Sequence, residues 1–424
     1  MNILKKASFA LIDQIVVSFG NFIVTFMLAR HLSKEDFGAY VLAYSLLTFA
    51  MAIHASLITT PLSVLISALD ETKATESLRA LHPGQRLLSI FNIAVFLVIS
   101  AVIWVIPQTR ILAPALFILS AIIFFQLGQS YLRFIMFSRF KMKAALVNDI
   151  ISYGGQVMGI YILIWYEYLN TPNAILVIGV TSLLAWGYGL YQCKRYFGPS
   201  SVGILEGLKE YYNYGKWLVG TNIISWVKEN IITYVSVFFL GLSAPAILKA
   251  IQTLFGPTHF LLLGVESVIP QHATRVYLKN GKTAFDNFMK QFLVLVTLPI
   301  VLFISLLSLF SKDILQILYR NQYDEYFPLV WIIGIQYLFI SLLTKPIISL
   351  KVIGQPKYIF NSNLIALSIT SIISVVLIYY GGLYGAAFSK GISSFLMFSI
   401  ASFTYFRIGR SKRSNTDASN TFIL

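Results

Sequence analysis

The sequence predicts an all-α integral membrane protein with about twelve transmembrane helices. Three observations support this prediction: 57% of the 424 residues are hydrophobic, only 12% are charged, and the mean hydropathy is +0.75. Soluble domains carry roughly 25% charged residues, so the deficit indicates a chain that lies mostly within a bilayer. A spanning helix needs about 20 mainly apolar residues, and the chain has room for about a dozen.

Apolar segments separated by short polar stretches mark the expected spans. The first follows Lys5 and Lys6 and exceeds the roughly 7–15 apolar residues of a signal-peptide core, which favours a retained helix. The second is long for one span, which predicts tilt or an extension to Pro61 and beyond. The expected segments are 8–30, 37–69, 87–106, 111–137, 144–166, 174–192, 213–239, 246–269, 289–310, 327–349, 358–380 and 383–406.

The distribution of lysine and arginine predicts the topology. With the N-terminus in the cytoplasm, most basic residues outside the spans fall in cytoplasmic segments, as the positive-inside rule requires. Both termini are therefore expected in the cytoplasm. The net charge of +15 is then mostly a topological signal, and nucleic-acid binding is disfavoured because the cations are spread over many loops. The basic residues expected on the opposite side are Arg30, Lys34, Arg110, Lys312 and Arg320.

A weak internal repeat predicts two pseudo-symmetric six-helix bundles around a central cavity. We expect an N-terminal half at 1–200, a C-terminal half at 201–410 and a disordered cytoplasmic tail at 411–424. Leu32-Ser33 in the first half matches Leu242-Ser243 in the second, and a proline ends the following long segment in each half. Because each half has an even number of spans, the repeats should be parallel, and transporters commonly bind their cargo between such halves.

Polar residues at helical spacing predict which helix faces line this cavity. Gln14, Ser18, Asn21 and Thr25 share one face of the first span. In the eighth span the Gly256-Pro257 pair predicts a kink. The expected substrate-binding residues are Lys228, Lys249, Gln14, Ser18, Asn21, Asn222 and Lys390.

Charged residues inside the expected spans are the main functional signal. Lys228 lies near the middle of the seventh span, where a charge is disfavoured by at least about 2.5–3.5 kcal/mol unless it faces a cavity or a partner. Lysine binds phosphate as a point charge, so an excess of buried cations suits an anionic, hydrophilic cargo. An internal pair with an acid on another helix is the alternative for Lys228. Glu229, Glu266 and His259 are the expected ion-coupling residues.

Other charges in the spans have simpler interpretations. Arg133 and Lys345 lie near cytoplasmic ends, from which long side chains extend toward the surface. Asp13 and Asp149 lie near the same boundary and are expected to cap a helix or form a pair. Cys193 is the only cysteine, which excludes an internal disulfide and a cysteine metal cluster. No metal site, cofactor or catalytic residue is expected, and no Walker-type glycine-rich motif is present.

The stretch "HLSKEDFGAYVLAYSLL" after the first span resembles the start of Wzx-type polysaccharide flippases. In that family the first helix runs into a short turn, and Leu32, Ser33, Phe37, Gly38 and Tyr40 stand at its positions here. The layout of spans and the basic cytoplasmic side extend the resemblance to the whole chain. The family belongs to the multidrug/oligosaccharidyl-lipid/polysaccharide exporter superfamily. The second half departs from the turn motif, with "AILKA" in its place.

The resemblance implies a transporter rather than an enzyme. It implies translocation of a polyprenyl-diphosphate-linked oligosaccharide, such as an O-antigen repeat unit for lipopolysaccharide, from the cytoplasmic to the periplasmic leaflet by alternating access. It also implies location in the bacterial inner membrane, H⁺ or Na⁺ coupling and contact with other polysaccharide-assembly proteins. Two alternatives remain: a multidrug exporter of the same superfamily, and a polytopic O-antigen polymerase or ligase that uses the loop pair Asp324-Glu325 as acid and base.

Overall fold

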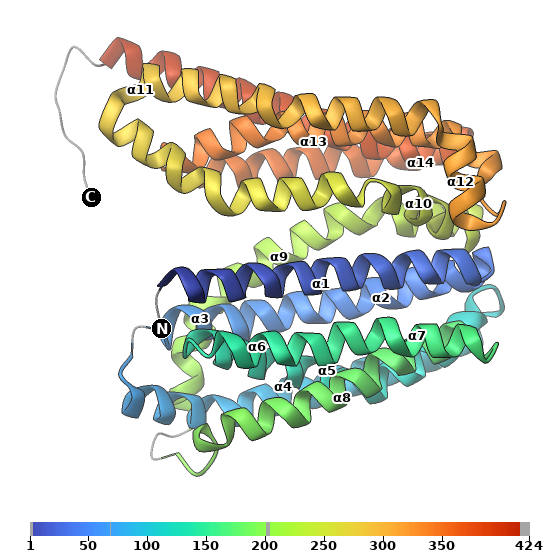
Figure 1. Cartoon of the computed structure of the whole chain (residues 1–424), viewed down its shortest axis with the longest axis vertical. Coiled ribbons are helices and arrows are strands. Elements are labelled where there is room, and N and C mark those ends of the chain that lie inside the picture. Colours follow the sequence, from blue (N-terminus) through green and yellow to red (C-terminus); the bar gives the residue numbers. More distant parts are fainter. Residues whose placement is uncertain (1–2, 68, 201–203, 416–424) are drawn as a thin grey trace. The chain divides into compact units, whose positions relative to one another are not determined.

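A computed structural model describes residues 3–67, 69–200 and 204–415 of the chain. Within these ranges the regular structure is entirely helical, which confirms the predicted fold class, and nine of the described helices are long and apolar enough to cross a membrane. The elements in chain order (Figure 1) are α1 (Ile3–His31), α2 (Lys34–His54), η1 (Ala55–Thr59), α3 (Thr60–Leu65), α4 (Glu71–Val105), η2 (Pro107–Leu112), α5 (Ala113–Ser138), α6 (Met142–Asp149), η3 (Ile150–Gly154), α7 (Gly155–Trp165), α8 (Thr171–Cys193), η4 (Lys194–Tyr196), α9 (Ile204–Leu240), α10 (Ser243–Leu254), α11 (Gly256–Leu309), α12 (Ser311–Tyr319), η5 (Asp324–Tyr326), α13 (Pro328–Val352) and α14 (Pro356–Asn415).

The predicted segments map onto these helices, although several of them are divided differently. α11 and α14 each contain a non-helical glycine that separates two apolar stretches. The fifth predicted span is divided among α6, η3 and α7. The eighth is divided between α10 and α11 at Phe255, immediately before the Gly256-Pro257 pair that predicts a kink.

Two glycines allow α11 and α14 to change direction sharply. Gly281 has φ +76° and ψ −177°, and Gly382 has φ +55° and ψ −133°. These combinations are strained for residues that carry a Cβ atom, so glycine is required at both positions. In Figure 1 α11 folds back on itself as two long legs. The stretch 271–288 between the eighth and ninth predicted spans is therefore almost entirely helical, with the reversal confined to Gly281.

Residue contacts divide the chain into two compact units. The first consists of Met1–Asn230 and Leu242–Ala246, and the second of Ile231–Gly241 and Ile247–Leu424. The division into six-helix halves at 1–200 and 201–410 stays a prediction. Of the expected tail, residues 416–424 lie outside the described residues, whereas α14 continues to Asn415.

The turn between α1 and α2 shows why its residues are needed. The Ser33 hydroxyl accepts a hydrogen bond from the Asp36 backbone N–H (3.1 Å) and so caps α2. The side chains of Phe37 and Tyr40 are buried beyond this cap. Gly38 packs directly against the backbone carbonyl of Leu242 in the same unit, where a Cβ atom would have no room. The motif therefore fixes a helix start and a close backbone contact.

Two π-helical turns interrupt long helices of the first unit. η1 separates α2 from α3 just before Pro61, whose missing N–H cannot continue the α-helical hydrogen bonds. η3 separates α6 from α7 and begins directly after Asp149. Such turns are frequent at functional sites. The second predicted span is therefore a helix that continues past Pro61, as its length predicts.

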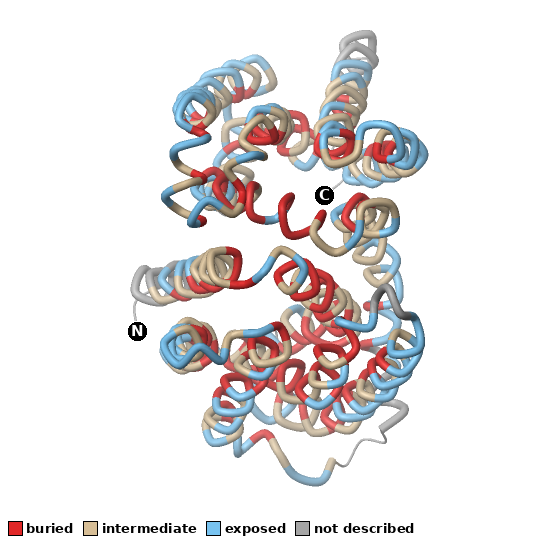
Figure 2. The backbone as a smooth tube through the Cα atoms, turned by 90° about the vertical axis from the view of Figure 1, so that its right-hand side faces the viewer, coloured by how far each residue is buried: buried red, intermediate tan, exposed pale blue. Residues whose placement is uncertain are grey.

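Each unit has its own apolar core. Figure 2 shows that buried residues of the first unit gather where its helices face one another. One buried cluster there joins α3, the N-terminal part of α4, α5 and the end of α8, with Leu62, Leu78, Leu132 and Cys193 among its members. A second cluster in the other unit joins α11, α13 and α14.

Candidate functional site

The strongest buried charge cluster of the first unit centres on Arg133. Its Nη2 group donates to Asp13 Oδ2 on α1 at 2.6 Å, and its Nε group donates to Asp149 Oδ2 at the end of α6. The Asp13 side chain is 2% exposed, the Asp149 side chain is fully buried, and the Arg133 side chain is 19% exposed. We call these three residues the Arg133 cluster. It joins three helices through charge-assisted hydrogen bonds.

Amide side chains extend the cluster toward α8. Gln129 Nε2 donates to Asn148 Oδ1 at 2.7 Å and to Asp149 Oδ1 at 3.2 Å. Asn148 Nδ2 in turn donates to the Ala185 carbonyl on α8 at 2.6 Å. The π-turn η3 follows Asp149 at once, so the irregular backbone and the buried charge coincide. Buried polar networks of this kind fix helix positions when their groups are satisfied.

The prediction that Arg133 extends to the membrane surface is wrong. Its guanidinium group pairs with two carboxylates because α1 and α6 bring acids within reach of α5. The prediction that Asp13 and Asp149 form a pair is confirmed, with Arg133 as the shared partner. The sequence contained a signal for this pairing, since one cation and two acids lay near the cytoplasmic ends of the expected spans.

The predicted polar stripe of α1 lies on one helix face. Gln14 Nε2 donates to Ser18 Oγ at 3.0 Å, one turn away. The Thr25 hydroxyl donates to the Asn21 carbonyl at 2.8 Å, and Tyr44 on α2 donates to Asn21 Oδ1 at 3.3 Å. Gln14 is exposed, whereas Ser18 and Asn21 are half-buried. The stripe thus joins exposed and partly packed positions, and its role in substrate binding stays a prediction.

The helix α9 is fastened to α2 and η1 through polar side chains. Asn222 Nδ2 donates to Ser56 Oγ in η1 at 2.7 Å. Trp226 Nε1 donates to the Ser45 carbonyl at 3.0 Å, and its ring packs on Phe49 with centroids 4.7 Å apart. The predicted cavity residue Asn222 therefore has a defined structural contact within the first unit.

Three consecutive polar residues, Lys228, Glu229 and Asn230, follow on α9 where the first segment of the first unit ends. Lys228 is half-buried, Glu229 is exposed, and the unit boundary falls immediately after Asn230. The Asn230 amide donates to the Trp226 carbonyl one turn earlier, at 2.9 Å. Lys228 and Glu229 thus differ in exposure although they are adjacent, because neighbouring helix positions point about 100° apart.

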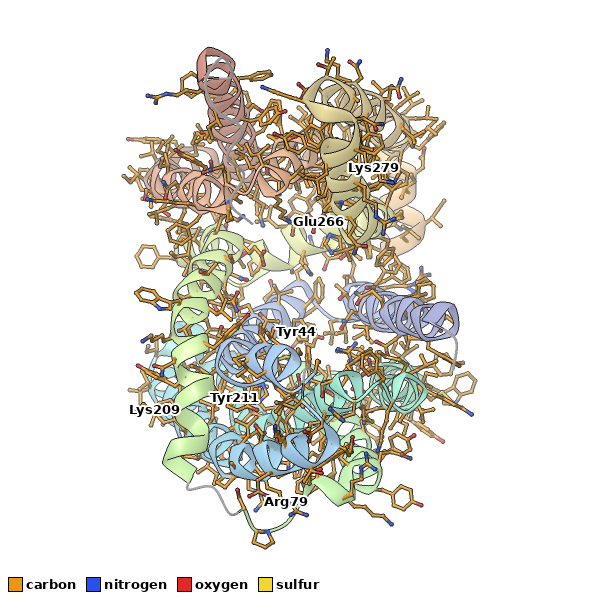
Figure 3. The ribbon with its side chains drawn as sticks, turned by 90° about the vertical axis from the view of Figure 1, so that its left-hand side faces the viewer. Tyr44, Arg79, Lys209, Tyr211, Glu266 and Lys279 are labelled. Carbon is orange, nitrogen blue, oxygen red and sulfur yellow. The ribbon has the colours of Figure 1, made fainter. Side chains whose placement is uncertain are left out.

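The remaining predicted residues lie in the second unit. Lys249 on α10 and His259 and Glu266 on α11 are exposed, whereas Lys390 on α14 is 8% exposed. Figure 3 labels Glu266 and Lys279 on α11, where both side chains are exposed. The assignment of the predicted residues to cargo binding and ion coupling stays a prediction.

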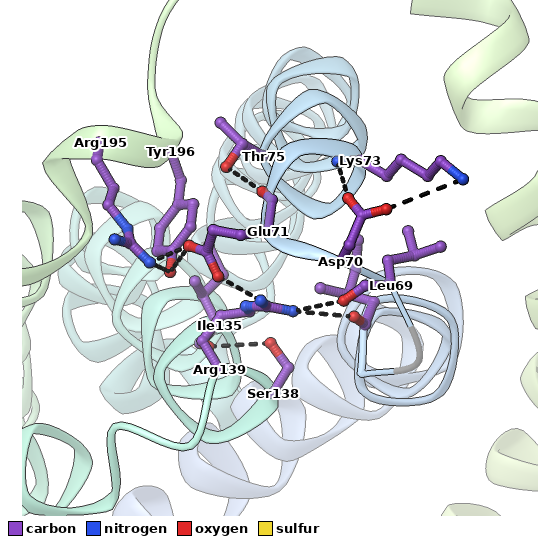
Figure 4. Close-up of polar contacts among 11 residues, drawn as sticks. Leu69, Asp70, Glu71, Lys73, Thr75, Ile135, Ser138, Arg139, Arg195 and Tyr196 are labelled. Atoms are coloured by element: carbon purple, nitrogen blue, oxygen red, sulfur yellow. Dashed lines mark hydrogen bonds and ion pairs between the residues drawn. The ribbon is translucent and has the colours of Figure 1, made fainter.

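A second ionic cluster, which the sequence alone did not indicate, ties three helix ends together. Glu71 at the start of α4 accepts hydrogen bonds from Arg139 after α5 and from Arg195 in η4 (Figure 4). Arg139 Nη1 also donates to the carbonyls of Leu69 (3.1 Å) and Ile66 (3.4 Å). We call Glu71, Arg139 and Arg195 the Glu71 cluster.

His82 adds a buried contact to the same region. Its Nδ1 lies 2.8 Å from the Tyr131 hydroxyl, and its Nε2 lies 3.1 Å from the Tyr196 carbonyl. Its ring stacks on Phe197 with centroids 4.0 Å apart. The stretch 71–86 between the second and third predicted spans forms the first part of the continuous helix α4.

The chain is similar to known proteins in sequence and in fold. The sequence matches the family described as "Polysaccharide biosynthesis protein" over residues 27–328. The comparison with curated proteins gave no match.

Three solved structures illustrate the likeness of fold. An inward-facing MATE family multidrug resistance transporter of the MOP superfamily has a TM-score of 0.78 at 13% identity, over 95% of this chain and 96% of that chain. The lipid II flippase MurJ in an inward closed conformation has a TM-score of 0.74 at 13% identity, over 99% and 94%. A MOP superfamily transporter from Pyrococcus furiosus has a TM-score of 0.62 at 12% identity, over 96% and 96%.

These structural likenesses show the fold, and the family match shows the family. The match begins within α1, spans the Ser33 turn and the whole Arg133 cluster except Asp13, and covers more than half of the chain. It confirms the resemblance that the turn motif indicated. The chain is a multi-pass membrane protein that belongs to the polysaccharide biosynthesis protein family and has the fold of MOP superfamily transporters.

Proposed function

We propose that the protein is a flippase for a polyprenyl-diphosphate-linked oligosaccharide in the bacterial inner membrane. The match to the polysaccharide biosynthesis family over residues 27–328 carries this proposal. The fold likeness to the lipid II flippase MurJ supports it, because that protein has a similar chain path. Cargo would move from the cytoplasmic to the periplasmic leaflet by alternating access, as an O-antigen repeat unit does in lipopolysaccharide synthesis.

The chemistry of the predicted binding residues supports an anionic, sugar-bearing cargo. Lys228, Lys249 and Lys390 supply cations, which bind phosphate as point charges. Hydroxyl and amide groups on α1, such as those of Ser18 and Asn21, suit the hydroxyl groups of sugars. A lipid tail needs no polar contact, because it stays in the hydrocarbon region of the bilayer.

Reconstitution tests the proposal directly. The full chain is placed in liposomes that contain a fluorescent polyprenyl-diphosphate oligosaccharide, and exposure of the label to an impermeant quencher is followed over time. Lys228→Ala and Lys249→Ala are compared with wild type. Lys279→Ala is the matched control, since Lys279 is an exposed α11 lysine outside the predicted binding set.

The outcomes separate the alternatives. Faster label exposure with wild type than with empty liposomes, slowed by either binding-site alanine but not by the control, supports the flippase and its cationic site. Fast exposure that is insensitive to Lys228 and Lys249 keeps the flippase and removes the site assignment. No exposure with folded protein favours a drug exporter or a polymerase or ligase, in which the η5 pair Asp324 and Glu325 would then be tested for acid–base chemistry.

A further inference from the structure

Two lysines and one aspartate of the second unit lie where α13 packs against α11 and α14 (Figure 1). Asp286 and Lys290 are one turn apart on the second leg of α11, and Lys345 on α13 lies within electrostatic range of both. Their neighbours Met289 and Ile348 belong to one buried apolar cluster, so helix packing brings the three charges together. We call Asp286, Lys290 and Lys345 the Lys345 cluster.

The Lys345 cluster carries one more positive charge than negative. Its lysines contribute two ammonium groups, and Asp286 contributes one carboxylate. Asp286 is also the only acidic residue in the stretches 270–310 and 340–415 of the sequence, so these parts of α11, α13 and α14 supply no second carboxylate. The excess positive charge attracts an anionic ligand.

A hydrogen bond from α14 holds the aspartate of the cluster. The Tyr405 hydroxyl donates to Asp286 Oδ1 at 2.6 Å. Tyr405 is 8% exposed, and Ser349 on α13 is fully buried close to it. Within the part of the chain that the structure describes, Asp286 forms no ion pair within 4 Å with either lysine. The aspartate is therefore fixed toward α14 instead of contacting the two ammonium groups.

Both lysines lie near the ends of membrane-spanning stretches. Lys345 is seven residues before the end of α13, which corresponds to about 10 Å along the helix axis. Lys290 lies at the start of the ninth predicted span, and its side chain is exposed. Because lysine stems extend along apolar surface toward the interface, the predicted topology brings both ammonium groups to the cytoplasmic boundary of the hydrocarbon region. Lipid phosphates lie at this level.

We propose that the Lys345 cluster binds the phosphate group of a membrane lipid in the cytoplasmic leaflet. Lys290 and Lys345 contact the phosphate oxygens as two point charges, while Tyr405 keeps the carboxylate of Asp286 away from them. Basic sites between transmembrane helices on the cytoplasmic side bind anionic head groups in this way. The inference goes beyond the proposed cargo, because an anionic phospholipid and a polyprenyl phosphate both carry the group that is recognised.

The positive-inside rule alone does not account for the cluster. A lysine that only sets topology needs no partner and lies exposed, as Lys279 and Lys357 do. Lys345 instead is half-buried within α13 and lies in electrostatic range of a second cation. Two like charges at one place are unfavourable unless an anion joins them. A phosphate group between the two lysines supplies that anion.

Lipid binding by the full chain tests the site. Native mass spectrometry of the protein in a neutral detergent measures the dissociation constant for phosphatidylglycerol, with phosphatidylcholine as the zwitterionic comparison. We expect phosphatidylglycerol to bind more tightly, and Lys290→Gln and Lys345→Gln each to weaken that binding about fivefold, the factor expected for the loss of one cation near a lipid surface. Lys279→Gln, at an exposed lysine elsewhere on α11, should leave the constant unchanged.

Variants at the acid sharpen the test because they shift binding in both directions. Asp286→Asn removes the negative charge of the cluster and should tighten phosphatidylglycerol binding. Tyr405→Phe changes no charge, but it releases Asp286 toward the lysines and should weaken binding. Equal constants for wild type, the two lysine variants and Asp286→Asn would overturn the proposal. If Lys345→Gln does not fold, the opposite shifts expected for Lys290→Gln and Asp286→Asn decide the matter.

Competition identifies the source of the phosphate. Polyprenyl phosphate, phosphatidic acid and inorganic phosphate are each added to the protein bound to phosphatidylglycerol. Stronger displacement by polyprenyl phosphate than by phosphatidic acid supports a site for a cargo-type lipid, and the reverse order supports a phospholipid site. Equally strong displacement by inorganic phosphate would show a soluble-anion site and overturn the lipid assignment. Failure of the flippase proposal would leave these constants unchanged, because they measure binding without transport.

Discussion

Arg133 on α5 donates a 2.6 Å hydrogen bond to Asp13 on α1, which joins two residues 120 positions apart in the chain. The same guanidinium group binds Asp149, so three helices of the first unit share one cation. The pairing explains how the first unit tolerates three charges within helices that are otherwise apolar. Each charge is retained because its partner is supplied by another helix.

Removal of Arg133 is expected to destabilise the protein strongly. Arg133→Met leaves two buried carboxylates without a cation, and breaking a buried ion pair from one side costs about 3–5 kcal/mol. Arg133→Lys should lose less, because one ammonium group can still reach one acid. Thermal unfolding of detergent-solubilised protein, followed by size-exclusion chromatography, measures both. Equal melting temperatures for wild type and Arg133→Met would show that the cluster contributes no stability.

Replacement of Asp149 should affect stability differently when Arg133 is already absent. Asp149→Asn in the Arg133→Met background removes one of the uncompensated charges, so it should recover part of the lost stability. Residues in one ion-pair network are non-additive by about 0.5–3 kcal/mol. A double-variant cycle with Arg133 and Asp149 measures this coupling. Strict additivity would contradict the ion pair.

The residues of the Glu71 cluster should contribute unequally to the stability of the protein. The Glu71 side chain is 48% exposed, so Glu71→Gln should cost only about 0.2–1 kcal/mol. Arg139→Ala should cost more, because the Arg139 side chain is 13% exposed and also donates to the carbonyls of Ile66 and Leu69. Hydrogen exchange of the backbone around residues 66–71 reports the difference. Equal exchange in the two variants would argue against the carbonyl contacts.

Gly281 and Gly382 are expected to resist substitution. Alanine at φ +76° or +55°, with these ψ values, is strained by about 1–3 kcal/mol. Gly264→Ala is the control, since Gly264 is helical with open space around it and alanine favours a helix by about 1 kcal/mol. Melting temperatures should fall for the first two variants and stay equal or rise for the third.

Trp226 is expected to fasten α9 to α2. Trp226→Phe keeps a ring against Phe49 but removes the hydrogen bond to the Ser45 carbonyl, which contributes about 0.5–1.5 kcal/mol. Trp226→Ala also removes the ring and should cost about 3–5 kcal/mol. Proteolysis within α9 at increasing temperature ranks the variants. Wild-type resistance in Trp226→Ala would show that other contacts hold the helix.

The sequence by itself determined the fold class and most helix positions, because those depend on local properties. A bilayer requires long apolar helices, and composition and segment length reveal them without any knowledge of packing. The turn at Leu32 and Ser33 was equally readable, since a serine cap acts on residues adjacent in the chain.

Only the tertiary structure decided which charges are partners. Arg133 was predicted to extend toward the membrane surface, since the sequence does not show that α1 and α6 place acids beside it. Likewise, the hydrogen bond that Asn222 donates to Ser56 could not be predicted from the spacing of Asn222 along its helix. Helix periodicity fixes the direction of a side chain on its own helix, whereas its partner depends on which helices pack together and at what height.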